Sequence, residues 1–576
     1  MKHAMKQLIA LLLVLLLVVG ITACSTTSQG ESNATNQGEG NTAEGSENNT
    51  TEEPTQNTVE ANQTEDRGVQ FPLENEVTLT MMVANVNGVD YEKDLAKCAY
   101  WQDLYEATNV KVEIIAIPAD DPLSTVNAMF QSGSEGDIIL LQNTVKQDTD
   151  FCSMIANGLF MDITEYVDNP SLMPNLYERV FAESPETRGM MTAPDGGVYC
   201  LPTRNATTWS MLESPMYINK TWLDKAGMKV EDIKTIDDLE KVLTYFAEND
   251  MNGNGIDDEI PFLLCQANNN AHVEAFCSLY GIPTKGGTTE SGLYIEDGEV
   301  KIAYTTQNYK DAILKLNDWY EKGLIWDQAF TATGNDFNAI VQTDTIGLCF
   351  RVNAPAGDEY VALNPVSVDG YSPSFFVNPG IICTNKQVAL TRSCEEPEIA
   401  LAWLDLFYTY DSAVRVTYGE PTDGFYEIVD GELVLNDLSA EEKAEILEKT
   451  PNLQWLMQMI TCRTSEDYAE RIGMSDADMQ KLTTYEAYDA AGALNDEIWP
   501  RPLMSEDVAV RLSELRTDIF NMINTKRASW IEGSADINAE WDQYIDDLNK
   551  MHIDEFVELN QEAYDVFLDS VSAFNK

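Results

Sequence analysis

The segment VTLTMMVAN, residues 77–85, decides the fold class, because it is the first run after a polar stretch that has the pattern of a buried strand. A helical pattern follows at residues 95–107, and a second strand pattern, VKVEIIAIP, covers residues 110–118. Residues 121–133 (DPLSTVNAMFQSG) have the pattern of a helix that ends at a glycine, and residues 136–142 (GDIILLQ) that of a third buried strand. Alternating strands and helices predict an α/β fold with a parallel sheet.

Composition predicts a large, strongly acidic protein. The chain has 576 residues, of which 44% are hydrophobic, and this length favours two or more domains or lobes. Its formal net charge is -60, and a surface of that charge repels phosphate backbones, so we expect no nucleic-acid partner.

The N-terminus has the pattern of an export signal. Positively charged MKHAMK precedes LIALLLVLLLVVG, residues 8–20, which is too short to span a membrane comfortably. The following ITAC resembles the lipobox of bacterial lipoproteins, which implies cleavage before Cys24 and a lipid on its thiol. We therefore expect a signal peptide at 1–23, and the lipidated Cys24 with a disordered tether rich in Ser, Thr, Asn, Gly and Glu at 24–75.

The chain offers few residues for catalysis. Its only histidines are His3, His272 and His552, and it contains neither a Walker-type phosphate loop nor a GxGxxG after a strand. The other nine cysteines are scattered without a CxxC spacing, and we expect most of them to be buried thiols. We therefore predict that the protein is not an enzyme. A surface glycoside hydrolase remains an alternative, because such an enzyme needs only two suitably spaced carboxylates.

Residues 249–261, NDMNGNGIDDEIP, resemble a shortened calcium loop. They follow a predicted helix, TIDDLEKVLTYFAEND, in which Thr235 and Asp238 occupy capping-box positions. An EF-hand needs side-chain oxygens at positions one, three and five, a glycine at six and a carbonyl at seven. These positions are held by Asp250, Asn252, Asn254, Gly255 and Ile256. Position twelve is Pro261 instead of glutamate, so a metal-free Asn-Gly turn remains the alternative.

Several further segments, in their order along the chain, carry a family resemblance. They are the lipobox, GGVYCLPT, YINKTWLDKAGMKVEDIKTIDDLEKVLTYFAENDMNGNGIDDEIPF, YEKGLI, YGEPTDGFYEIVDG and WIEGSADINAEWDQYIDDLNKMHIDEFVELNQEAYD. Over residues 77–565 the chain resembles the family 1 extracellular solute-binding lipoproteins, which capture oligosaccharides for bacterial ABC importers.

The resemblance implies an α/β fold of the type II periplasmic-binding-protein kind, with a ligand cleft between two lobes and a helix-rich C-terminal region. We expect lobe 1 at 76–208 plus about 372–430, and lobe 2 at 209–371 plus about 431–576. It also implies a monomer on the extracellular face of the cell membrane, held there only by its N-terminal lipid, that delivers an oligosaccharide to ABC transporter permease subunits. Alternatives are a peptide or a charged glycan fragment as the ligand.

The resemblance also completes the metal site, because related lipoproteins close the shortened loop with an adjacent acidic pair. The implied ligands of a structural Ca²⁺ are Asp250, Asn252, Asn254, the Ile256 carbonyl, Asp258 and Glu259. Oxygen ligands without histidine or cysteine favour calcium over transition metals.

Ligand-binding residues are expected at the carboxyl ends of strands and on the segments that cross between lobes. A sugar site needs aromatic faces and planar polar groups. By this rule the candidates are Asn85, Asn87, Gln142, Arg204, Asn205, Trp209, Arg351, Tyr371 and Phe375. Trp319, Trp403 and Trp541 lie in apolar helical patterns and are expected in the core.

Overall fold

The computed structural model describes residues 68–85, 98–207, 212, 214–266, 272–284, 292–350, 360–377, 387–429, 432–436, 438–439, 442, 445–446, 460–464, 476–495, 497 and 499–575. The expected signal peptide, Cys24 and nearly all of the expected tether lie outside these residues. Within them, no helix is both long and apolar enough to cross a membrane.

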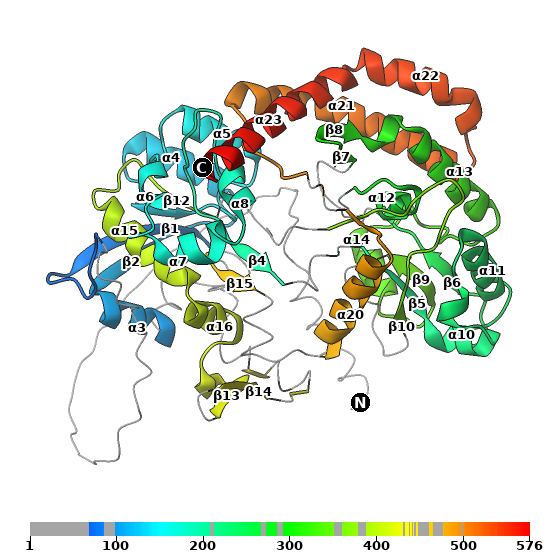
Figure 1. Ribbon diagram of the computed structural model, residues 1–576, viewed down its shortest axis with the longest axis horizontal. Helices are drawn as coiled ribbons and strands as arrows, with labels where there is room; N and C mark the ends of the chain where they lie inside the picture. The colour runs from blue at the N-terminus through cyan, green and yellow to red at the C-terminus, as the bar shows by residue number, and fades with distance from the viewer. Residues whose placement is uncertain are drawn as a thin grey trace, which may run out of the picture.

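Two four-stranded sheets organise the chain, and Figure 1 shows them in separate halves of the molecule. The first sheet has the order β12 (Val388–Leu390), β3 (Ile138–Leu140), β1 (Val77–Ala84) and β2 (Val110–Ile117). β1 pairs in parallel with both β2 and β3, which confirms the predicted parallel sheet, while β12 joins β3 in the antiparallel sense. We call the described residues packed on this sheet lobe 1.

The second sheet is mixed. Its order is β10 (Tyr360–Leu363), β5 (Met216–Asn219), β9 (Ile346–Phe350) and β6 (Ile260–Leu263). β9 pairs in parallel with β6 and antiparallel with β5, which in turn pairs antiparallel with β10. We call the described residues packed on it lobe 2. The molecule is therefore a two-lobe α/β structure, as expected from the sequence.

Helices surround both sheets. In lobe 1 they are α3 (Ala99–Thr108), α4 (Pro122–Ser132), α5 (Asp148–Ala156), α6 (Thr164–Val167), α7 (Pro174–Leu176), α8 (Pro185–Met190), α15 (Pro397–Asp405) and α16 (Tyr410–Tyr418). In lobe 2 they are α10 (Lys220–Ala226), α11 (Ile236–Ala247), α12 (His272–Cys277), α13 (Gln307–Glu321), α14 (Gly334–Ile340) and α20 (Asp476–Ala490).

Short strand pairs complete the fold. They are β4 (Arg204–Ala206) with β15 (Cys462–Thr464), β7 (Leu293–Glu296) with β8 (Glu299–Ile302), β11 (Phe375–Phe376) with β16 (Leu494–Asn495), and β13 (Tyr426–Val429) with β14 (Glu432–Leu435). The β4–β15 pair is parallel and lies at the inner side of lobe 1.

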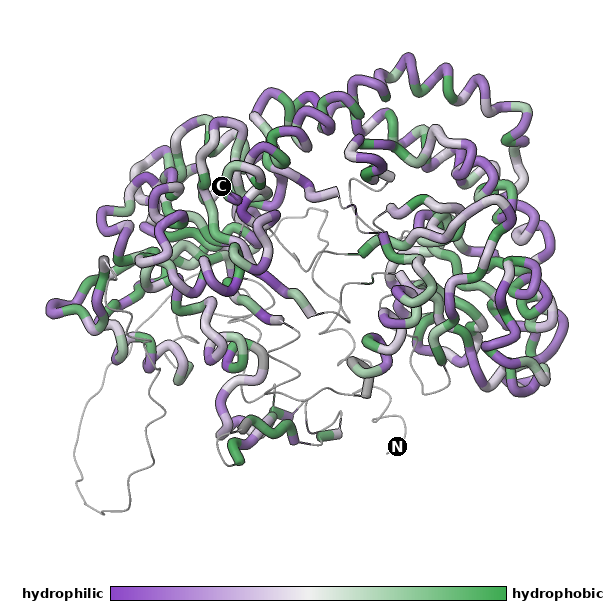
Figure 2. The backbone as a smooth tube through the Cα atoms, in the orientation of Figure 1, coloured by the Kyte–Doolittle hydropathy of each residue, from purple (hydrophilic) through white to green (hydrophobic). Residues whose placement is uncertain are grey.

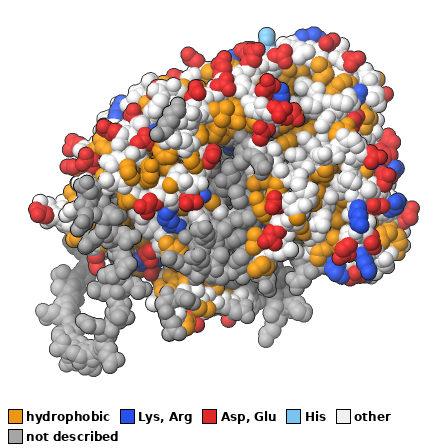
Figure 3. Space-filling view, in the orientation of Figure 1, with side chains coloured by type: hydrophobic (Ala, Val, Ile, Leu, Met, Phe, Trp, Pro, Cys, Tyr) orange, Lys and Arg blue, Asp and Glu red, His pale blue; other side chains and the backbone are white. Residues whose placement is uncertain are grey.

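Apolar side chains fill the interior of both lobes, and Figure 2 shows hydrophobic stretches in the middle of each lobe. Trp319 and Trp403 are fully buried, as predicted, whereas Trp541 packs at the edge of the lobe 2 core. The eight described cysteines form no disulfide and are all buried, which confirms the prediction that most of the thiols are buried. Acidic side chains are spread over the visible surface of both lobes (Figure 3).

The C-terminal helices link the two lobes, as Figure 1 shows at the top of the molecule. They are α21 (Glu506–Ile531), α22 (Ile537–Lys550) and α23 (Ile553–Phe574), which confirms the predicted helix-rich C-terminal region. α21 contacts α5 of lobe 1 and α13 of lobe 2, and α23 packs on β8 and on α8. The ring of Phe574 lies 6.0 Å from that of Tyr177 and 5.7 Å from that of Phe181, measured between centroids, so the chain ends against lobe 1.

The close approach of α23 to α8 depends on Gly189. A Cβ atom added there would lie 2.4 Å from Cγ2 of Val571 and 3.1 Å from the ring of Phe567. We expect Gly189→Ala to lower the free energy of unfolding by about 1–2 kcal/mol, because the crowding outweighs the better helix propensity of alanine. Urea unfolding measures the change.

The matched control for this contact is the double variant Gly189→Ala with Val571→Ala, which removes the nearest obstructing methyl group. The double variant should be more stable than the sum of the two single changes predicts. If the effects of the two single changes on the free energy of unfolding simply added, the contact between residue 189 and Val571 would not be the cause of the destabilisation.

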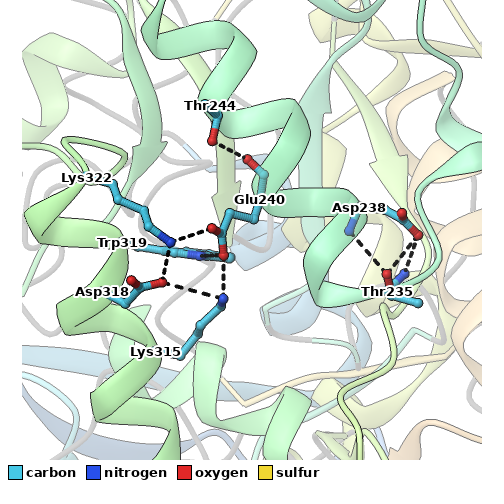
Figure 4. A network of polar contacts seen from close by, with 8 residues as sticks. All are labelled: Thr235, Asp238, Glu240, Thr244, Lys315, Asp318, Trp319 and Lys322. Atoms are coloured by element: carbon cyan, nitrogen blue, oxygen red, sulfur yellow. Dashed lines mark hydrogen bonds and ion pairs between the residues drawn. The ribbon is translucent and has the colours of Figure 1, made fainter.

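A charge network fastens α11 to α13 in lobe 2 (Figure 4). α11 begins with the predicted capping box of Thr235 and Asp238, which the structure confirms. One turn later Glu240 accepts hydrogen bonds from Lys315, from Lys322 at 2.6 Å and from the indole nitrogen of Trp319 at 2.9 Å. Partial burial by itself raises the pKa of Glu240, but these donors outweigh burial and lower the pKa to about 2.

This lowered pKa predicts how stability depends on pH. Stabilisation by Glu240 is complete above the unfolded-state pKa near 4.3 and is lost as the pH falls through about 2. We expect Glu240→Gln to lower the free energy of unfolding by on the order of 2 kcal/mol at pH 7 and by less at pH 3, measured by urea unfolding. Glu248→Gln, at the exposed end of the same helix, is the control and should change little at either pH. If Glu240→Gln lowered the free energy of unfolding equally at both pH values, the lowered pKa of Glu240 would be contradicted.

Candidate functional site

Polar side chains of lobe 1 gather where the parallel strands end. Asn85 follows β1, and its backbone N–H donates to the carbonyl of Ile117 at the end of β2. Gln142 follows β3, and its Oε1 accepts a hydrogen bond of 3.1 Å from the side chain of Gln387, which precedes β12. Because β1 and β3 are parallel, both predicted residues lie at the same edge of the sheet.

The β4–β15 pair continues this edge toward the other lobe. Leu201 is bonded to Val388 at the start of β12, so the following residues Arg204 and Asn205 leave from the carboxyl end of β3. Arg463 of β15 pairs in register with Asn205. Arg204 is buried and donates through one terminal nitrogen to the Arg179 carbonyl at 2.7 Å, so its guanidinium is held in place by the backbone of lobe 1.

Lobe 2 presents polar groups after β6 and near β11. Gln266 follows β6 and is fixed by a hydrogen bond from its backbone N–H to the Ala329 carbonyl. The hydroxyl of Tyr371 donates to Asp311, and this hydrogen bond raises the pKa of Tyr371 to about 12. Phe375 is 1% exposed, and its ring lies 4.9 Å from that of Tyr488, measured between centroids. Of the two predicted aromatic residues that the structure describes, Tyr371 is therefore the more accessible.

Four buried polar atoms around these strand ends have no hydrogen-bond partner in the described part of the chain. They are Oδ1 of Asn85, Nε of Arg204, Nε of Arg463 and Oε1 of Gln266. Buried polar groups are normally paired, because an unpaired group loses its hydration without compensation. Three of these atoms belong to lobe 1 and one to lobe 2, so each lobe offers hydrogen-bonding capacity that the protein itself does not use.

Sequence reasoning named some of these residues and missed others. Asn85, Gln142, Arg204 and Asn205 come together at one edge of lobe 1, whereas Tyr371 and Phe375 belong to lobe 2. The expected residues Asn87, Trp209 and Arg351 lie outside the described residues. Gln266 was missed although it follows a strand, so the strand-end rule could have found it.

Arg463 was missed for a different reason. It is far from Asn205 in sequence, and only the parallel pairing of β15 with β4 brings the two together. The sequence around residues 462–464 contains no local pattern that predicts such a pairing.

The predicted calcium loop folds tightly between α11 and β6. The Asp250 carboxylate accepts hydrogen bonds from three backbone N–H groups, those of Gly253, Asn254 and Gly255, at 2.6 to 3.1 Å. Oε1 of Glu259 accepts from the backbone N–H of Met251 at 2.7 Å. Both glycines have a positive φ, 78° at Gly253 and 77° at Gly255, which explains why glycine occupies these turns.

The oxygen atoms of this loop are suited to a hard cation. Asp258 accepts hydrogen bonds from the side-chain amides of Asn252 and Asn254 at 3.0–3.1 Å, so these three side chains already converge. Rotating the two amide groups would turn their oxygen atoms toward the same region. Ile256 is 61% exposed, so its side chain points outward.

The carboxylates alone do not form a metal cluster. Nowhere in the described ranges do three His, Cys, Asp or Glu side chains lie close enough together to hold a metal ion. In this loop the ligand set would therefore depend on amide and carbonyl oxygens as well, which is the type of shell that Ca²⁺ accepts.

Comparison with known proteins gives a family and several relatives. Residues 99–419 match a family model described as bacterial extracellular solute-binding protein. The fructooligosaccharide ABC transporter substrate-binding protein FusA of Streptococcus pneumoniae serotype 4 is 27% identical over 516 residues, which is 87% of this chain and 92% of FusA.

Solved structures agree with this relationship. The structure of S. pneumoniae FusA in complex with kestose superposes with a TM-score of 0.68 at 26% identity, over 85% of this chain and 99% of that chain. A FusA structure described as an EF-hand mutant in complex with fructo-nystose gives the same TM-score at 25% identity, again over 85% and 99% of the two chains. A solute-binding protein from Bifidobacterium longum infantis, described as binding HMO, matches with a TM-score of 0.70 at 23% identity over the same shares and supports the fold alone.

Proposed function

The chain belongs to the bacterial extracellular solute-binding family, and we propose that it captures an oligosaccharide between lobes 1 and 2 and delivers it to the permease of an ABC importer. Similarity to FusA, a fructooligosaccharide-binding component of an ABC transporter, covers nearly the whole chain and supports this class of ligand. The proposed division of the chain is 76–208 plus about 372–430 for lobe 1, and 209–371 plus about 431–576 for lobe 2. Two short segments depart from it, because Phe375 packs in the core of lobe 2 and β15 pairs with β4 of lobe 1.

The observation that carries the proposal is the set of unpartnered polar atoms at the strand ends. A sugar presents many hydroxyl groups, each of which can donate and accept a hydrogen bond. Oδ1 of Asn85 and Oε1 of Gln266 would accept from hydroxyl groups, and the Nε atoms of Arg204 and Arg463 would donate to them. Since one of these residues belongs to lobe 2 and three to lobe 1, a bound sugar would be favoured by approach of the two lobes.

Aromatic and polar residues expected from the sequence complete the proposed site. Trp209 would supply a flat apolar surface for a pyranose or furanose ring. Asn87, Gln142, Asn205 and Arg351 would supply further polar groups. Tyr371 and Phe375 would lie at the return crossing between lobes.

In this proposal the protein binds its ligand without catalysing a reaction, and it does so at the outer face of the cell membrane. Capture and release require only a change in the distance between lobes, which needs no acid, base or nucleophile. A lipid on Cys24 would hold the mature chain as a monomer on the extracellular side, and this lipid would be its only contact with the membrane.

A glycan fragment that carries a carboxylate is the second candidate ligand, and the two arginines favour it. Arg204 and Arg463 are cationic groups in a chain of net charge -60, and neither is paired with a carboxylate within the described residues. Guanidinium groups bind carboxylates through paired hydrogen bonds that are stronger than those to hydroxyl groups.

Calcium is the proposed structural ion of the loop that follows α11. Its ligands would be Asp250, Asn252, Asn254, the Ile256 carbonyl, Asp258 and Glu259. The convergence of oxygen atoms in this loop supports the site, as does the EF-hand named for FusA. A bound Ca²⁺ would neutralise the carboxylates and fix the end of α11 to the start of β6.

Calorimetry with a panel of neutral oligosaccharides, acidic oligosaccharides and peptides tests the binding proposal. We expect kestose or another neutral oligosaccharide to bind, and Asn85→Ala and Gln266→Ala each to weaken binding about 5- to 30-fold, because each removes a buried acceptor. Asn538→Ala, on the exposed face of α22, is the control and should leave the Kd unchanged.

The same panel separates the candidate ligands. Binding of an acidic oligosaccharide that is lost in Arg463→Gln would identify the charged glycan instead. Binding of peptides and of no carbohydrate would overturn both candidates.

Chelation tests the calcium proposal. We expect EGTA to lower the melting temperature by about 5 °C, and added Ca²⁺ to restore it, because a ligand bound only to the folded state stabilises it. Asp250→Ala should abolish this response while changing the oligosaccharide Kd less than twofold. The exposed Asp257, next to the proposed ligands, provides the control, and Asp257→Ala should respond to calcium as the wild type does. A melting temperature that is insensitive to EGTA would refute the site.

A further inference from the structure

A fully buried helix in lobe 2 connects several parts of the proposed binding site. Every residue of α12 and of the helical turn after it, Ser278–Tyr280, is buried. At its start, Nδ1 of His272 accepts a hydrogen bond of 3.1 Å from the backbone N–H of Cys265, which directly precedes Gln266. α12 therefore holds Cys265, and through it the position of the adjacent Gln266, which belongs to the proposed site.

The far end of the same unit contacts the return crossing. The Ser278 carbonyl accepts a hydrogen bond of 2.8 Å from the backbone N–H of Ser374, next to Phe375. The ring of Tyr280 lies 5.1 Å from that of Tyr371, measured between centroids. Two separate segments of the proposed site, after β6 and before β11, thus take their positions from one short helix.

This helix carries a buried carboxylate whose cationic partner comes from the C-terminal region. Glu274 is 2% exposed, and its Oε1 accepts hydrogen bonds from the guanidinium of Arg527 and from the hydroxyl of Tyr304 at 3.0 Å. Arg527 is also 2% exposed and comes from α21, one of the helices that link the lobes. Removing a carboxylate from water is costly, so the position of α12 is tied to that of Arg527.

The pair is not arranged for maximum stability. Oε2 of Glu274, Nε of Arg527 and the neighbouring hydroxyl of Tyr309 are buried without a partner among the described residues. A buried ion pair with unsatisfied atoms generally contributes no more to stability than apolar side chains of similar size. Stability alone therefore does not explain why these two residues are charged.

We infer that the Glu274–Arg527 ion pair is a positioning contact for the proposed binding site, through which α21 sets the placement of α12 and thereby of Gln266 and Tyr371. The ion pair itself does not contact the ligand. Directional hydrogen bonds fix α12 in one orientation, whereas apolar side chains would allow it to shift. This inference rests on the proposed function, because it concerns the same site.

A double apolar replacement tests this inference. Arg527→Met alone should lower the melting temperature by about 5 °C, because it leaves the Glu274 carboxylate buried without its cation. Glu274→Met combined with Arg527→Met removes both charges and should melt within about 2 °C of the wild type. We expect this double variant nonetheless to bind kestose at least about 10-fold more weakly, measured by calorimetry. We also expect its amides at residues 264–266 and 272–280 to exchange faster with deuterium.

The matched control is another ion pair of α21. Arg511 pairs with Glu555 of α23 at 2.7 Å, away from α12. The double replacement Arg511→Met with Glu555→Met should therefore leave the Kd unchanged, and also the amide exchange of residues 264–266 and 272–280. If the Glu274–Arg527 double variant does not fold, Glu274→Gln combined with Arg527→Met replaces it, because the amide keeps the side-chain size and can still accept from the Tyr304 hydroxyl, and no buried charge remains.

The outcomes separate this inference from the proposed function. A Kd within twofold of the wild type, with unchanged exchange at residues 264–266 and 272–280, would show that the pair has only a structural role and would overturn the inference. Absence of any oligosaccharide binding by the wild type would overturn the proposed function instead. The exchange measurement would then still decide whether the pair positions α12.

Discussion

The packing of α23 onto α8 is the contact on which the two-lobe arrangement depends. The last helix starts beside lobe 2 and ends against lobe 1, where Phe567 and Val571 cover Gly189 and Phe574 reaches Tyr177. A glycine is needed because the two helices lie closer than a Cβ atom permits. Together with α21, this helix gives the lobes a shared apolar interface, so any change in the distance between lobes must be accommodated around it.

The side chains in the lobe cores stabilise the fold, whereas the polar side chains at the strand ends are suited to binding a ligand. In the lobe cores almost every large side chain is apolar, and the Glu240 network satisfies its carboxylate with three donors. At the strand ends, by contrast, buried polar atoms of Asn85, Arg204 and Gln266 are left unpaired. Unpaired groups reduce the stability of the free protein, and a ligand that pairs them recovers that free energy as affinity.

Sequence patterns predicted the features that local chemistry determines. The capping box of Thr235 and Asp238 lies within four residues, and the strand pattern at 77–85 needs only its own side chains to be recognised. Contacts between distant segments could not be predicted in this way. Arg463 meets Asn205 through a parallel strand pair, and Glu274 meets Arg527 across 253 positions of sequence. Both contacts depend on how whole lobes and helices pack, which no local pattern encodes. The sequence therefore predicted that the site lies at strand ends, but it could not identify every residue of the site, such as Arg463.

The eight buried thiols have a consequence for the life of an exported protein. Burial raises the pKa of the Cys98 thiol and raises that of Cys394 to about 11, so neither forms the reactive thiolate while the fold is intact. Since the described cysteines form no disulfides, maturation of this part of the chain requires neither an oxidant nor disulfide reshuffling. Unfolding, however, would expose all eight thiols at once to oxidation and to random cross-linking, which would prevent refolding. The working lifetime of the protein in an oxidising environment is therefore set by its unfolding rate, because each unfolding event risks being irreversible.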